Sequence, residues 1–135
     1  MNIGKVGIVA YALAALLPGC IVTTDDHHGP PPVGTLTVEW TINGGTNPDD
    51  CAFYGADHLE LLIYTGPGDL VTEVDPICED FSVSVDLDPG RYSADATLVD
   101  SANRSATVTA PLDGLVVTDG TDLVSSIDFP DGSFL

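Results

Sequence analysis

The stretch that decides the fold of this chain is FSVSVDLDPGRYSADATL, residues 81–98. Apolar side chains occupy every second position on both sides of a central Asp88-Pro89-Gly90. A period of two sends neighbouring side chains to opposite faces, so each side predicts a strand with one buried face. Asp, Pro and Gly together are typical of a turn. The alternating apolar positions are Phe81, Val83, Val85 and Leu87, then Tyr92, Ala94, Ala96 and Leu98.

The same alternation continues outward in both directions. The further runs are Leu36, Val38, Trp40 and Ile42; Leu59, Leu61 and Ile63; Ala106, Val108 and Ala110; and Leu123, Ser125, Ile127 and Phe129. Turn formers separate them at Asn43-Gly44-Gly45, Gly66-Pro67-Gly68-Asp69, Asp113-Gly114 and Asp119-Gly120. Short strands with regular turns predict an all-β domain over residues 35–135. We expect a seven- or eight-stranded antiparallel Greek-key β-sandwich with little helix, in which Trp40 and Tyr92 are core residues before they are ligand platforms.

Residues 81–98 also carry a family resemblance. The order of strand, leucine, Pro-Gly, x-Tyr and strand resembles a hairpin of transthyretin-like and carboxypeptidase-regulatory-like domains. In those families the turn joins adjacent strands of a seven-stranded Greek-key sandwich, and the tyrosine packs inward. The resemblance implies a fold and no particular activity.

The chain begins with a segment typical of export. Lys5 and the amino terminus are positive, and an uncharged run follows from Val6 to Leu17. This run is shorter than the roughly 20 apolar residues that a membrane-spanning helix needs. Pro18-Gly19 then breaks it. The pattern predicts a signal peptide over residues 1–19.

Leu17-Pro18-Gly19-Cys20 resembles the lipobox of bacterial lipoproteins. The resemblance implies cleavage after Gly19, a diacylglycerol thioether on Cys20 and acylation of the new amino terminus, for example with palmitate. The membrane is then a partner through this lipid. Ile21 follows Cys20 where an Asp commonly retains such proteins in the inner membrane, so we expect the outer membrane, with the domain facing either periplasm or cell surface. The alternative is a soluble secreted protein with a coincidental cysteine.

Residues 20–34 read as a flexible, lipid-anchored linker. Three consecutive prolines, Pro30 to Pro32, favour an extended polyproline conformation. His27 and His28 follow two aspartates and form a candidate Zn²⁺ or Cu²⁺ ligand pair. A flexible segment gives no fixed coordination geometry, so we expect no specific metal site there.

With Cys20 assigned to the lipid, Cys51 and Cys78 remain. Two cysteines in an exported chain predict one disulfide. By loop entropy it should add about 3.5 kcal/mol to the stability of the domain. The alternative is a metal or catalytic site formed by both cysteines with His58, although no Cys-x-x-Cys pair is present.

The charge of the chain limits its partners. Asp and Glu number 21 against 3 Lys and Arg, for a formal net charge of −18. Cleavage would leave only Arg91 and Arg104 as strong cations. Because nucleic-acid affinity depends on Lys and Arg displacing counterions, we expect no nucleic-acid partner. A protein or polysaccharide partner stays open.

Sequence motifs argue against catalysis. The domain has one histidine, His58, and no G-x-S-x-G serine elbow. Asn47-Pro48-Asp49-Asp50, Asp113 and Asp119 offer oxygen ligands for Ca²⁺, but no EF-hand loop occurs. We therefore expect a non-enzymatic binding or structural module without cofactor. The alternative is a carboxylate-based, glycan-active enzyme or a Ca²⁺-dependent binding domain.

Overall fold

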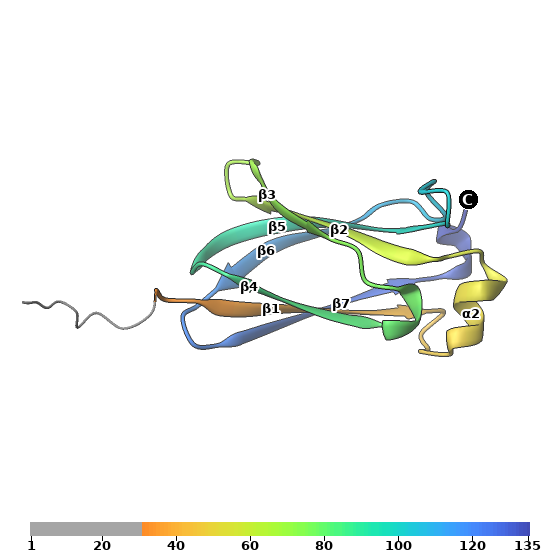
Figure 1. Ribbon diagram of the computed structural model, residues 1–135, viewed down its shortest axis with the longest axis horizontal. Helices are drawn as coiled ribbons and strands as arrows, with labels where there is room; N and C mark the ends of the chain where they lie inside the picture. The colour runs from red at the N-terminus through yellow and green to blue at the C-terminus, as the bar shows by residue number, and fades with distance from the viewer. Residues whose placement is uncertain (1–30) are drawn as a thin grey trace, which may run out of the picture. The chain divides into compact units, whose positions relative to one another are not determined.

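The computed structural model describes residues 31–135, which form two packed β-sheets (Figure 1). This confirms the predicted β-sandwich, with seven strands. The strands are β1 (Gly34–Ile42), β2 (His58–Thr65), β3 (Leu70–Val74), β4 (Ser82–Leu87), β5 (Gly90–Val99), β6 (Ala110–Val117) and β7 (Asp122–Phe129). The helical segments are α2 (Pro48–Phe53), η2 (Cys78–Asp80) and η3 (Asp131–Ser133). Over these residues no helix has the length and apolar character to cross a membrane.

One sheet has the strand order β4-β1-β7 and the other has β3-β2-β5-β6. Every pair is antiparallel except β1 with β7, which run parallel from Thr35 beside Asp122 to Ile42 beside Phe129. The expectation of a purely antiparallel sandwich was therefore wrong at this pair. The first and last strands are not joined by a short turn, so chain connectivity does not impose an antiparallel arrangement on them.

The segment 88–89 joins two sheets, so the expected hairpin across it was wrong. β4 pairs with β1, whereas β5 lies between β2 and β6. The Tyr92 hydroxyl donates a 2.6 Å hydrogen bond to the backbone carbonyl of Asp88 and fixes the crossing. A tyrosine bonded back to the chain at such a corner is typical of Greek-key sandwiches. Because β5 returns to lie beside β2, the chain follows the Greek-key path that the sequence predicted.

The strand expected over residues 106–110 lies further along the chain, as β6. The expected turn at Asp113-Gly114 is a bulge inside this strand, because both residues stand opposite the single residue Ser93 of β5. Gly114 has a φ of +67°, a left-handed conformation that glycine adopts without strain. The extra residue keeps Leu115 buried in the core. Period-two alternation cannot locate such an insertion.

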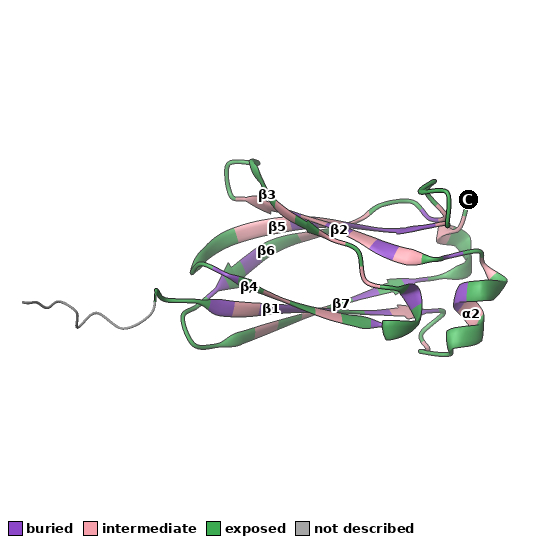
Figure 2. Cartoon of the chain, in the orientation of Figure 1, coloured by how far each residue is buried: buried purple, intermediate pink, exposed green. Residues whose placement is uncertain are grey.

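The core takes its buried residues from the strands of both sheets, and these residues are purple in Figure 2. On β1 the predicted inward residues, Leu36, Val38, Trp40 and Ile42, are at most 1% exposed. On β2, Leu59, Leu61 and Ile63 are fully buried. Burying each large apolar side chain contributes about 1.5–3 kcal/mol. The alternation in the sequence therefore identified the core correctly on these strands.

The two ends of the sandwich are built from different loops. We call the end where β1 begins the base, and the end where it finishes the tip. The base holds Val33, whose amide donates to Asp119 Oδ1 at 3.1 Å, and Gly34, where an added Cβ would clash with the Thr118 carbonyl oxygen. At the base, the backbone that leads into β1 therefore lies close against residues 118–119. The tip holds residues 43–57, 75–81, 100–109 and 130–135.

Candidate functional site

The tip presents a short helix, α2, at one end of the domain (Figure 1). Asn47 caps it by accepting a 3.1 Å hydrogen bond from the Asp49 amide, and Pro48 occupies the first turn, where a missing N–H costs nothing. Asp49 and Asp50 place negative charge at the positive end of the helix dipole. Local sequence therefore specifies this helix, and only Cys51 of α2 is buried.

A disulfide fastens α2 to the neighbouring 3₁₀ helix η2. Cys51 and Cys78 are both fully buried, with Cα atoms 6.0 Å apart, inside the range of ordinary disulfides. This confirms the pairing that the sequence predicted and removes the alternative in which both cysteines join His58 in a metal or catalytic site. The cap stabilises the start of the helix, and the bridge attaches the helix to η2.

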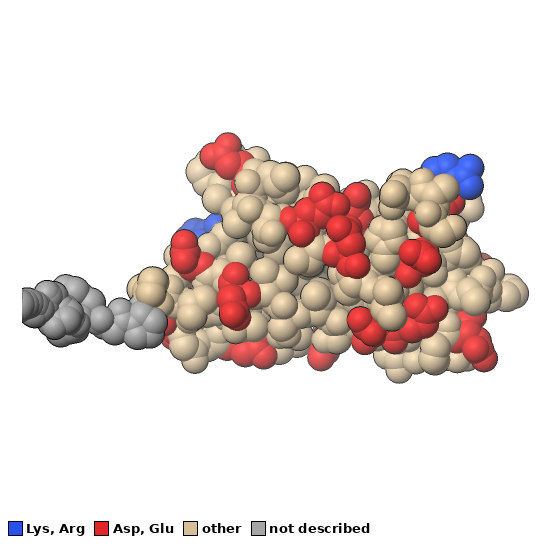
Figure 3. All heavy atoms as spheres, in the orientation of Figure 1, with Lys and Arg blue, Asp and Glu red and all other residues tan. Residues whose placement is uncertain are grey.

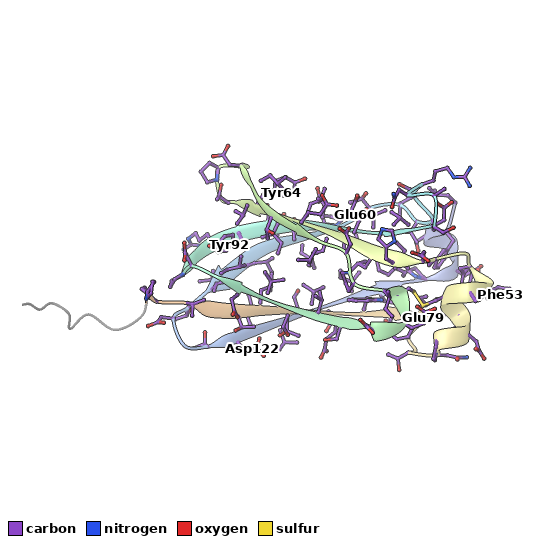
Figure 4. All side chains as sticks on the ribbon, viewed as in Figure 1. Phe53, Glu60, Tyr64, Glu79, Tyr92 and Asp122 are labelled. Atoms are coloured by element: carbon purple, nitrogen blue, oxygen red, sulfur yellow. A yellow bond between two sulfur atoms is a disulfide. The ribbon has the colours of Figure 1, made fainter. Side chains whose placement is uncertain are left out.

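Three aromatic rings, Phe53, Tyr54 and Phe134, form a row at the tip. Tyr54 stacks on Phe134 with centroids 4.0 Å apart, and Phe53 meets Tyr54 edge-on at 4.9 Å. Phe53 is 79% exposed, and Figure 4 shows it at the end of the domain that carries α2. We call these three residues the aromatic row.

Hydrogen bonds hold Tyr54 in place. Asn43 Nδ2 donates to Tyr54 Oη at 2.9 Å, Tyr54 Oη donates to Asp131 Oδ1 at 2.8 Å, and the Asp131 amide donates to Asn43 Oδ1 at 2.7 Å. The bond to the Asp131 carboxylate raises the pKa of Tyr54, since it stabilises the protonated phenol. Segments far apart in the chain thus lock the middle ring of the aromatic row.

A groove of about 700 Å³ adjoins the tip on the outer face of the three-stranded sheet. Its outward side chains come from all three strands, with Glu39 of β1 between Ser82 and Ser126 in register. Asp80 of η2 and Asp128 of β7 add carboxylates. Trp40, Phe81 and Ile127 also line the groove, so it combines carboxylates with an apolar lining. We call Glu39, Asp80 and Asp128 the groove carboxylates.

Acidic groups far outnumber basic groups on the face of the domain that Figure 3 shows. All but two of the 21 Asp and Glu residues lie in residues 31–135, against only Arg91 and Arg104. Arg104, in the loop after β5, lies 3.2 Å from Asp100. Hydrogen bonds from the backbone amides of Arg104 and Ala102, with a smaller effect of the Arg104 side chain, hold the pKa of Asp100 below its usual range. Arg104, one of the two arginines, is therefore already paired with a carboxylate of the domain itself.

A second acidic cluster lies on the outer face of the four-stranded sheet. Glu60 of β2 lies near Glu73 and Asp75, and one oxygen from each lies within 4.8 Å of the others. Repulsion from Asp75 raises the pKa of Glu73 above its usual range. His58 lines the same hollow and hydrogen-bonds Asp57 at 3.0 Å. Glu73 and Asp75 are exposed, so water screens this repulsion.

The cluster predicts a stability change with pH. Because the pKa of Glu73 is raised by folding, its charge opposes folding at neutral pH, and this opposition fades as pH falls through that pKa. Glu73→Gln should raise the unfolding temperature slightly at neutral pH and match the wild type in acid. Thermal unfolding followed across pH tests this, with Asp69→Asn in the exposed β2–β3 turn as control. An equal gain from both variants at neutral pH would assign the effect to net charge alone.

The residues that sequence analysis proposed for Ca²⁺ do not come together. Asn47 caps α2 at the tip, and Asp49 and Asp50 lie in its first turn. Asp113 is in the β6 bulge, and Asp119 accepts a hydrogen bond from the Val33 amide at the base. Cys20, His27 and His28 lie outside the described residues.

The aromatic row and the two acidic groups were not predicted. Each is assembled from strands or loops distant in sequence, and tertiary structure alone joins them. The nearest sequence signal was the adjacent pair Phe53-Tyr54 outside any alternating run.

Comparisons with known proteins assign no family. No family model matches the sequence, and no curated protein matches it significantly. Among solved structures, a leucine-rich repeat protein from Bacteroides thetaiotaomicron VPI-5482 aligns with a TM-score of 0.39 and 16% identity. The alignment covers 96% of this chain and 16% of that protein, so the chain spans a small part of its length. A likeness at this level indicates neither a common fold nor a common function.

Proposed function

We propose that this protein is a lipid-anchored component of a bacterial cell envelope whose β-sandwich binds a partner macromolecule at its tip without catalysing a reaction. One observation carries the proposal: the tip holds an exposed Phe53 on a helix that a disulfide and the hydrogen-bonded Tyr54 attach to the rest of the domain. Exposed aromatic side chains with restricted motion are typical centres of binding surfaces. Fixing them beforehand lowers the entropy lost on binding.

The position of the tip suits an anchored protein. The proposed lipid on Cys20 would act through the linker, residues 20–34, which joins the domain at the base. β1 has nine residues and runs from base to tip, roughly 30 Å at about 3.3 Å per residue. An anchor at one end thus leaves the loops of the other end free to meet a partner. The Cys51–Cys78 disulfide supports export, because such bonds persist in oxidising compartments.

The alternative, a carboxylate-based enzyme or Ca²⁺-dependent binder, has its best location at Glu60, Glu73 and Asp75. A general acid for glycoside hydrolysis usually has its pKa raised by a water-excluding pocket. Here the pKa of Glu73 is raised mainly by the charge of Asp75, on an exposed side chain. This arrangement is typical of crowded surface charge, and it favours the non-enzymatic proposal.

The anchor is tested by the intact mass of the protein purified from membranes. We expect a chain that begins at Cys20 and carries acyl groups, with a gain of about 2 Da on reduction of the one disulfide. Cys20→Ser should move the protein from the membrane to the soluble fraction. A mature chain without lipid in the wild type would contradict the anchor.

Binding at the tip is tested by cross-linking in living cells. A photoreactive phenylalanine analogue at position 53 should give a discrete cross-linked product, whereas the same group at position 69, in a base turn, should not. A product from position 69 alone, or none from either position, would contradict the proposed function.

A further inference from the structure

The tip combines an exposed aromatic ring with unmatched negative charge. Phe53 is 79% exposed, and Asp49 and Asp50 share its six-residue helix. A cation over an aromatic face is attracted by the ring quadrupole, and nearby carboxylates add a direct Coulombic attraction. Arginine and lysine side chains can make both of these interactions, because their charge stands at the end of a long aliphatic stem.

The groove extends this chemistry from α2 along the sheet. Thr46 lines it and directly precedes the cap residue Asn47, and Asp80 lines it from η2, which the disulfide ties to α2. Its volume of about 700 Å³ is large enough for several side chains of an extended segment. The groove thus begins beside the loop that leads into α2, and its carboxylates continue the negative charge of Asp49 and Asp50 from the tip onto the sheet.

Charge complementarity selects the class of occupant. Residues 31–135 carry two arginines, and Arg104 is already 3.2 Å from Asp100. The resulting field repels nucleic acids and other polyanions and attracts cations from a distance. A neutral glycan would use the aromatic ring but gain little from the carboxylates. A basic protein segment uses both features.

From this geometry we infer that the tip and its groove bind an extended, arginine- or lysine-rich segment of a partner protein. One basic side chain lies against Phe53, and the next ones enter the groove and pair with Glu39 and Asp80. This inference rests on the proposed binding function and names the chemistry of its partner. Binding should be fast and sensitive to salt, because the attraction is largely electrostatic.

The test uses the full chain in mild detergent and a synthetic peptide of alternating arginine and glycine, followed by fluorescence anisotropy at several salt concentrations. Phe53→Ala should weaken binding by about 3- to 5-fold, the size of an exposed cation–π contact. Glu39→Gln with Asp80→Asn should weaken it further and flatten its salt dependence. A peptide with glutamate in place of arginine should not bind.

Two control variants isolate the tip. Leu70→Ala removes an exposed apolar side chain at the base, and Asp69→Asn with Asp88→Asn removes two charges there. Both should bind the arginine peptide as the wild type does. An equal loss with the base charges, or no loss with Phe53→Ala, would overturn the inference.

Failure of this inference is distinguishable from failure of the proposed function. Cross-linking from position 53 in cells, together with no binding of the arginine peptide, would retain the function and reject a basic partner. A neutral glycan that competed for the cross-link independently of salt would identify the other class of occupant. Loss of the cross-link itself would reject the proposed function and this inference together.

Discussion

Trp40→Ala is expected to lower the free energy of unfolding by about 3–5 kcal/mol, the usual cost of deleting a fully buried large aromatic side chain. Trp40 is 1% exposed and lies in the half of β1 nearer the tip. Its indole Nε1 donates a 3.1 Å hydrogen bond to the Cys78 carbonyl, and its ring lies 6.4 Å from that of Phe81. The substitution leaves both a cavity and an unpaired carbonyl.

Because a small domain has about 5–15 kcal/mol of stability in total, a large fraction of Trp40→Ala should unfold near physiological temperature. Urea unfolding followed by far-ultraviolet circular dichroism measures the loss, since Trp40 is the only tryptophan of the chain. Trp40→Phe keeps an aromatic ring but loses the donor to Cys78, so it should cost less than Trp40→Ala. Equal stability of the alanine variant and the wild type would contradict this packing.

Cys51→Ala with Cys78→Ala is expected to cost about 3.5 kcal/mol, mainly because the unfolded chain regains the freedom of a closed loop. The bridge spans a sequence separation of 27 and joins α2 to η2. Loss of the bridge should therefore loosen the tip more than the strands. Hydrogen exchange should become faster in residues 47–56 and 76–81 while the centres of β1, β2 and β5 stay protected.

Reduction of the wild type should reproduce the lowered stability of the double variant, and a reductant should not affect the double variant. The double variant also tests the role of the disulfide in binding. If the disulfide fixes Phe53 for binding, the double variant should also bind the arginine peptide more weakly at a temperature where its strands remain folded. Unchanged hydrogen exchange at α2 after reduction would show that the bridge does not hold the tip.

Local patterns in the sequence were enough to predict which residues of β1 and β2 face the core. On β1 and β2 the apolar members of each alternating run are buried, because a strand has only two faces and burial selects one. The disulfide was also predictable, because only Cys51 and Cys78 remained after Cys20 was assigned to a lipid. The sequence Asn47-Pro48 is likewise typical of a helix start, but a search for alternation with a period of two does not detect helices.

The pairing of the strands could not be predicted from the sequence. Alternation predicts a buried face but not the neighbour across the sheet, so neither the parallel β1–β7 pair nor the crossing from β4 to β5 was visible in the sequence. β3, with Leu70 and Val71 exposed, gave too weak an alternating signal to be identified. The β6 bulge shifted the pattern by one residue and was mistaken for a turn.

The sequence by itself determined a two-layer β domain, its central core residues, its disulfide and its acidity, because these follow from residue type and local spacing. Tertiary structure decided which side chains meet at the tip. Phe53 and Tyr54 meet Phe134, and Asp80 meets Glu39 and Asp128 around one groove, only because sheet pairing brings distant loops to one end. Exposed residues are under no periodic constraint, so their clustering follows from long-range pairing and leaves no local trace in the sequence.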